Sequence, residues 1–202
     1  MKITKYFILL GMFLINTMVI AAPFINGEDY ITLNKPVFGL PPVVEFFSFF
    51  CPHCYQFELM FHQNEKLSTF KTFKYHVDIS KGKILTQAWS ISIALGIEKS
   101  AILPIFETVI RNNLMVSADD VAKVFNNLGI SMRDYYYLWN SLSVRLLTFK
   151  QEQSAKSFPI TSVPTIVVDG KYLIKNEAIK GSSIYKKLQQ YSKIVNYLHK
   201  IP

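Results

Sequence analysis

Cysteine is scarce in this chain of 202 residues, which contains only Cys51 and Cys54. A small extracellular scaffold held together by disulfides needs several pairs, so the composition excludes that class. One pair that closes a loop of four residues also removes little chain entropy from the unfolded state, so a purely structural disulfide is a poor explanation. The two cysteines are therefore candidates for chemistry.

Arginine is also rare, and the sequence has no run of basic residues; the three arginines are Arg111, Arg133 and Arg145. The formal net charge of +8 comes from lysines dispersed along the chain. This pattern indicates a solvated surface, and we predict no nucleic-acid partner. With 50% hydrophobic and 18% charged residues, the chain can bury a core, so it is globular and not disordered.

The first 21 residues have the pattern of a secretory signal peptide. Lys2 and Lys5 precede an apolar run over residues 6–20, and Ala21 and Ala22 follow it. A helix that spans a bilayer needs about 20 apolar residues, so this run is short for a membrane anchor. We predict cleavage after Ala21 and export of the rest of the chain, with an uncleaved anchor as the alternative.

A strand–helix–strand pattern follows in the first third of the exported chain. Residues 43–50 form an apolar, β-branched run typical of a strand buried on both faces. Pro52 suits the first turn of a helix, which continues to about residue 67. Residues 72–79 form the next strand, so we expect a parallel pair with a right-handed crossover.

The remaining sequence predicts a block of helices and then two strands and a helix. The helices are expected at 85–96, 101–113, 117–129 and 131–158. Asp169-Gly170 between two apolar runs indicates a hairpin within residues 164–174, and a final helix is expected at 182–200. The fold class is therefore α/β, in the order βαβ, helical insertion, ββα.

The motif CPHC places Cys51 just ahead of the predicted helix that begins at Pro52. Free N–H groups and the helix dipole stabilise a thiolate there, and the dipole alone can lower a pKa by roughly one unit. His53 can add to this through its charge or by N–H donation. A stabilised thiolate exists only in the reduced protein, so its disulfide becomes an oxidant. Cys54, one turn into the helix, is then the resolving thiol.

Metal binding is the alternative for the two thiols. Zinc usually takes four ligands, and His62 and His76 are the only further candidates within reach. We interpret these two histidines and His199 as ordinary surface or core residues. We predict no metal and no cofactor other than a redox-active disulfide between Cys51 and Cys54.

Glu45 interrupts the apolar strand predicted at 43–50. A buried carboxylate must pair with a cation or take up a proton, and Lys74 on the neighbouring strand is the partner that we predict. Glu45 then serves either as a structural ion pair or as a relay for the proton of Cys54. In the stretch SVPT, Pro164 stands at the first position of a strand, where proline is tolerated.

The stretches FFSFFCPHCYQF, FKYHVDI, LTQAWSISIALG, LWNS and VPTIVVDGKY occur in this order. Together they closely resemble the DsbA family of bacterial periplasmic thiol:disulfide oxidoreductases, over essentially the whole exported chain. The resemblance implies a thioredoxin fold with an inserted all-helical domain. The chain then divides into a signal peptide (1–21), a first thioredoxin-like part (22–79), the helical insertion (80–158) and a second thioredoxin-like part (159–202).

The resemblance also implies roles for residues of the active site. Cys51 is the nucleophile that forms mixed disulfides, Cys54 resolves them and His53 stabilises the thiolate. Val163 and Pro164 are expected to be joined by a cis peptide bond that faces the active site. The family's buried charged pair corresponds to Glu45 and Lys74, and its helical-domain tryptophans correspond to Trp89 and Trp139.

Partners and location follow from the same resemblance. The substrates are expected to be unfolded or folding exported proteins with free cysteines, bound at an apolar groove beside the active site. A DsbB-like membrane protein that passes electrons to quinone is expected to reoxidise the enzyme, in the periplasm. No heptad pattern indicates an oligomer, so we expect a monomer.

The sequence departs from the family in two respects. The segment between the active-site helix and FKYHV is a few residues shorter, and the lysine-rich surface is more basic. Two other functions stay open beside the disulfide donor. One is a reductase or isomerase with a less oxidising disulfide, although the chain has no room for a dimerisation domain. The other is a metal-binding or chaperone module.

Overall fold

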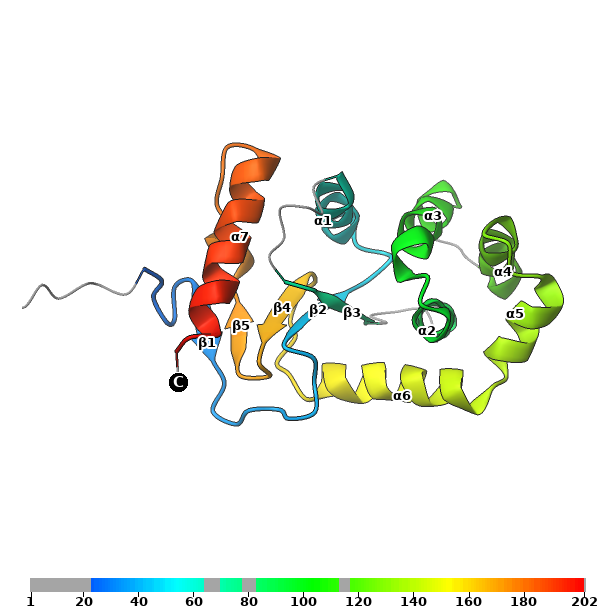
Figure 1. The fold of residues 1–202 in the computed structure, drawn as a ribbon, viewed down its shortest axis with the longest axis horizontal. Coiled ribbons are helices and arrows are strands. Elements are labelled where there is room, and N and C mark those ends of the chain that lie inside the picture. Colours follow the sequence, from blue (N-terminus) through cyan, green and yellow to red (C-terminus); the bar gives the residue numbers. More distant parts are fainter. Residues whose placement is uncertain (1–22, 64–69, 78–82, 113–116, 202) are drawn as a thin grey trace, which may run out of the picture.

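The computed structural model describes residues 23–63, 70–77, 83–112 and 117–201. The predicted signal peptide lies outside these residues, as does the larger part of the connection before FKYHV. Within them, the chain forms a five-stranded sheet with helices packed on it and a block of helices at one end (Figure 1). The predicted thioredoxin fold with a helical insertion is confirmed.

The sheet has the strand order β1-β5-β4-β2-β3. β2 pairs in parallel with β3, as predicted, and the other three pairs are antiparallel. The strands are Tyr30–Thr32 (β1), Val43–Phe47 (β2), Phe73–His76 (β3), Thr165–Val168 (β4) and Tyr172–Ile174 (β5). The three-residue β1 has no counterpart among the predicted strands.

The hairpin between β4 and β5 turns at the predicted dipeptide. Asp169 and Gly170 both have positive φ, 51° and 62°, as a tight two-residue turn requires. A Cβ atom on Gly170 would lie 1.9 Å from the carbonyl oxygen of Val37, so the position also requires a residue without a side chain. The turn thus fixes the register of the two strands.

β2 is buried along its whole length, because both faces of the sheet are covered. Helices α1 (Pro52–Gln63) and α7 (Ile184–Leu198) pack on one face, where Val43 joins an aromatic-rich cluster with Tyr191. On the other face, Val44 and Phe46 pack with Phe158, which follows helix α6. Alternate residues of β2 therefore enter two different cores.

The helical insertion has its own core, which also reaches the end of β2. Its helices are α2 (Ile84–Leu95), α3 (Glu98–Arg111), α4 (Ala118–Asn127), α5 (Met132–Trp139) and α6 (Leu142–Lys156). The prediction of one helix over 131–158 is wrong, since the chain breaks at Asn140 and Ser141. The hydroxyl of Ser141 accepts the N–H of Val144 at 3.3 Å and caps α6, so the break begins a new helix.

Two side chains of the insertion cover β3, which is the edge strand of the sheet. The indole N–H of Trp89 donates to the carbonyl of Lys74 at 2.8 Å. The side-chain oxygen of Gln151 accepts the backbone N–H of His76, also at 2.8 Å. These bonds satisfy backbone groups that an open edge would expose, and they join the insertion to the sheet.

Candidate active site

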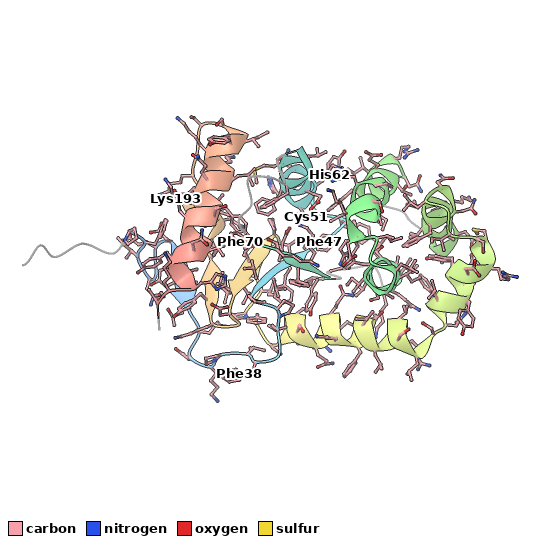
Figure 2. All side chains as sticks on the ribbon, in the orientation of Figure 1. Phe38, Phe47, Cys51, His62, Phe70 and Lys193 are labelled. Atoms are coloured by element: carbon pink, nitrogen blue, oxygen red, sulfur yellow. The ribbon has the colours of Figure 1, made fainter. Side chains whose placement is uncertain are left out.

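Cys51 lies at the junction between β2 and α1 (Figure 2). Its N–H donates to the carbonyl of Ser48 at 3.0 Å, and its own carbonyl accepts the N–H of Tyr55 at 3.1 Å. Pro52 is the first residue of the helix, where its missing N–H costs no hydrogen bond. Pro52 and His53 are exposed, Cys51 is half-buried and Cys54 is buried.

The sulfur of Cys51 receives hydrogen bonds from the first turn of α1. The N–H of Cys54 donates to Cys51 Sγ at 3.2 Å. Hydrogen bonding with the thiol of Cys54 lowers the pKa of Cys51 most, followed by the N–H groups of Cys54 and His53 and then by the charge of His53. Burial opposes these effects, and the pKa falls from 9.0 to about 6. Cys51 is therefore a thiolate at neutral pH.

Cys54 has the opposite environment. It is 1% exposed and lies in the apolar core that Phe47, Phe49 and the insertion form. Its hydrogen bond to Cys51, its burial and the nearby Glu45 carboxylate all raise the pKa of Cys54. This thiol keeps its proton while Cys51 is ionised.

The loop before β4 faces the cysteines. The Val163–Pro164 bond is cis, as expected, and Cys51 Sγ lies 3.3 Å from the carbonyl oxygen of Val163, to which it donates when it is protonated. The amide of Asn176 donates to the carbonyl of Pro164 at 2.8 Å and holds the loop from the other side. Residues 112 positions apart in the sequence thus form one site.

A buried charge cluster lies on the inner side of α1. Lys74 pairs with Glu45, as predicted, and also with Glu58 on α1 at 2.8 Å. Burial alone would lower the pKa of Lys74, but the two carboxylates outweigh it and raise that pKa. Burial raises the pKa of Glu45 even though Lys74 counteracts it. The cation is held charged by two acids, and Glu58 is a site residue that the sequence prediction lacked.

Comparison with known proteins identifies this arrangement. Residues 42–193 match the model of the DSBA-like thioredoxin domain, which is more than half of the chain. The chain belongs to the DsbA family. It is 43% identical to the thiol:disulfide interchange protein DsbA of Salmonella typhimurium over 185 residues, which cover 88% of this chain and 89% of that protein. The DsbA of Escherichia coli K12 is 41% identical over 186 residues, with the same coverage.

Solved structures agree with this assignment. The disulfide oxidoreductase DsbA of Proteus mirabilis is 38% identical and superposes with a TM-score of 0.79, covering 88% of this chain and 97% of its own. The DsbA of Klebsiella pneumoniae is 27% identical, with a TM-score of 0.78 over 87% of this chain and 97% of its own. The protein is therefore an enzyme of the DsbA type, a protein disulfide oxidoreductase.

The structure also locates the remaining histidines, His62, His76 and His199. Among the described residues, no three His, Cys, Asp or Glu side chains are arranged to hold a metal ion. His62 is exposed, and His76 is buried with its Nδ1 atom 2.8 Å from the hydroxyl of Thr86. His199 pairs with Asp169 at the surface, 2.7 Å away. None of the helices in the described part of the chain has the length and hydrophobicity needed to cross a bilayer.

A cavity of about 550 Å³ lies at the edge of β3, lined by Glu58, Lys74 and Trp89 among others. Cys51 does not line it. Phe50, Tyr55 and Val163 are partly buried apolar residues that pack, like Cys51, against the core of the insertion. The apolar groove expected beside the active site stays a prediction.

Proposed function

We propose that this protein donates the Cys51–Cys54 disulfide to newly exported proteins. The observation that carries the proposal is the opposite environment of the two thiols. The hydrogen bond from the Cys54 thiol and the N–H donors at the start of α1 lower the pKa of Cys51 to about 6, and the same hydrogen bond together with burial raises that of Cys54. This asymmetry stabilises the reduced protein, so the disulfide has a strong tendency to take up electrons.

The reaction begins when a substrate thiolate attacks Cys51 Sγ in the oxidised protein. The S–S bond breaks as the new bond to Cys51 forms, and the bonding electron pair leaves on Cys54. Because Cys54 is buried and its pKa is raised, its sulfur takes up a proton. Attack at Cys51 is favoured since Cys51 is half-buried and Cys54 is buried.

The second step releases the oxidised substrate. Another thiolate of the substrate attacks the substrate sulfur of the mixed disulfide, and the electron pair leaves on Cys51. The N–H groups of Cys54 and His53 stabilise this leaving thiolate, so its departure is fast. The substrate has lost two electrons and two protons; the protein holds both electrons and one proton, on Cys54, and the other proton has gone to the solvent because Cys51 stays a thiolate.

Relatives support a polypeptide as the substrate. A variant of the Proteus mirabilis DsbA, 39% identical to this chain, binds the peptide PWATCDS without a covalent bond. In the present protein, Phe50, Tyr55 and Val163 are partly buried apolar residues packed against the same core as Cys51, and apolar side chains of this kind suit an unfolded segment. We place the reaction in the periplasm, with reoxidation by a DsbB-like membrane protein that passes electrons to quinone, and with the enzyme acting as a monomer.

The reduction potential of the disulfide tests this proposal. The protein is equilibrated with graded glutathione buffers and the Cys51–Cys54 disulfide is scored by mass spectrometry. A disulfide donor is expected to have a reduction potential well above roughly −200 mV, which is the redox potential of the compartments in which disulfides are isomerised. A value near that of thioredoxin, about −270 mV, would overturn the proposal and favour a reductase.

A further inference from the structure

Helix α6 has an apolar stripe on the side that faces away from the rest of the protein. Leu142, Leu146 and Phe149 follow one another at spacings of four and three residues, which places them on one face. Their exposed fractions are 69%, 58% and 58%. The opposite side of the helix faces the core with Val144, Thr148, Gln151 and Ser154.

Three cationic side chains border this stripe. With about 100° between successive residues of a helix, Arg145 and Lys156 lie along one side of the stripe and Lys150 along the other. All three are exposed, and none forms an ion pair with a residue in the part of the chain that the structure describes. The only acid of α6, Glu152, is paired with Lys83 at 3.1 Å.

Phe38 extends the apolar surface beyond the helix. It is 88% exposed and lies in the loop between β1 and β2. The loop is attached to the sheet, because the N–H of Val37 donates to the carbonyl of Gly170 at 2.9 Å. Figure 2 shows Phe38 pointing to the same side of the molecule as the outer side of α6.

The charges of this face argue against two other occupants. A second copy of the chain would bring the same three cations against each other, on a chain whose formal net charge is +8 with Lys2 and Lys5 of the predicted signal peptide included. An unfolded substrate would have to reach Cys51 at the same time, yet β2 and β3 lie between Cys51 and α6 (Figure 2). An anionic surface meets neither objection.

We propose that the outer face of α6, together with Phe38, binds the surface of an anionic lipid bilayer. An apolar stripe between basic flanks is the pattern of helices that lie in a membrane interface. Each of the three cations contributes about fivefold in affinity near an anionic leaflet. Bound in this way, the protein keeps Cys51 directed away from the lipid. The inference is independent of the redox chemistry proposed above.

Vesicle co-sedimentation tests this inference. The protein used in this assay begins at Ala22, so that the apolar run at residues 6–20 does not contribute to binding. Binding to vesicles of equal parts phosphatidylglycerol and phosphatidylcholine is expected to be at least tenfold tighter than binding to phosphatidylcholine alone. Salt at 0.5 M is expected to weaken it, because surface charges are then screened.

Variants separate the stripe from its flanks. Leu146→Ser with Phe149→Ser is expected to weaken binding at least tenfold, and Arg145→Gln with Lys150→Gln about twentyfold. The matched control is Ile184→Ser with Lys187→Gln on α7, which removes one exposed apolar and one exposed cationic side chain elsewhere. The control is expected to change binding less than twofold.

A second readout keeps the test independent of overall charge. In the variant Leu146→Trp, the fluorescence emission of the introduced tryptophan is expected to shift to the blue when anionic vesicles are added, because this side chain enters an apolar environment. All variants must keep the circular dichroism spectrum and the disulfide-exchange rate of the parent protein.

Four results would overturn the inference. Equal binding to neutral vesicles, or an equal loss in the α7 control, would show that the α6 face has no special role. A dimer in sedimentation analysis that Phe149→Ser dissociates would show that a second copy covers the stripe. An unshifted emission of Leu146→Trp on bound vesicles would exclude contact between α6 and lipid.

Discussion

Cys51, just before α1, and Cys54, in its first turn, lie three residues apart, yet their environments are opposite. A hydrogen bond with the thiol of Cys54, and then the N–H groups of Cys54 and His53, lower the pKa of the half-buried Cys51 to about 6. The same hydrogen bond, burial in an apolar core at 1% exposure and the nearby carboxylate of Glu45 raise the pKa of Cys54. The start of a helix therefore favours one of two neighbouring thiolates, and the other thiol retains the proton.

The largest effect is expected when one cysteine is replaced and the reactivity of the remaining one is measured. In Cys54→Ser, Cys51 keeps the backbone donors and should react rapidly at pH 7 with a small aromatic disulfide that releases a coloured thiolate. In Cys51→Ser, the remaining Cys54 is buried and protonated and should react at least 10³-fold more slowly. Stopped-flow absorbance measures both rates, and rates within tenfold of each other would contradict the asymmetry.

A second prediction concerns the charge cluster on the inner side of α1. Lys74→Met leaves the buried carboxylates of Glu45 and Glu58 without their cation, which is expected to cost about 3–5 kcal/mol of unfolding free energy. Urea denaturation of the oxidised protein measures the loss. The triple variant with Glu45→Gln and Glu58→Gln removes the unpaired charges and is expected to recover most of it. A triple variant as unstable as Lys74→Met would contradict this account.

Most of the fold could be predicted from local patterns. The apolar run predicts the central strand. The dipeptide Asp169-Gly170 predicts the hairpin, because only a few residue types tolerate two successive positive φ angles. The cap of α4 also forms as expected, since Ser117 and Asp120 bind each other's backbone N–H groups. The cis bond before Pro164 could be expected only from the family resemblance, because an X-Pro sequence carries little information on its isomer.

What the sequence did not show depends on contacts between distant segments. Glu58 is four residues after Cys54 and thus on the same face of α1, but an acid in a helix usually faces water. Glu58 can be buried because it pairs with Lys74 on β3, and the sequence pattern of α1 gives no information about this contact. Similarly, His76 is 1% exposed because the insertion covers it, and burial lowers its pKa to about 3.

The third prediction compares the reduced and oxidised proteins as a function of pH. Only the reduced protein has the Cys51 thiolate, whose pKa is about 6 when folded and near 9 when unfolded. Since the folded pKa is the lower one, this stabilisation is complete above pH 9 and is lost as pH falls to 6. The stability advantage of the reduced form should therefore grow between pH 6 and pH 9. It should stay below the roughly 4 kcal/mol of three full pKa units, because solvent screens the half-exposed sulfur. Denaturant titrations of both forms measure it, and a constant difference would contradict a lowered pKa.

The smallest effect is expected from the side chain of His53. The backbone N–H of His53 lowers the pKa of Cys51 more than its imidazole charge does, and the imidazole is exposed. His53→Ala keeps the N–H group and removes the charge, so we expect the pKa of Cys51 to rise by about one unit or less. Thiolate absorbance near 240 nm during a pH titration measures the shift, with Gln56→Ala as a control at another exposed position of α1. A rise of more than two units would show that the imidazole, and not the start of the helix, chiefly makes Cys51 different from Cys54.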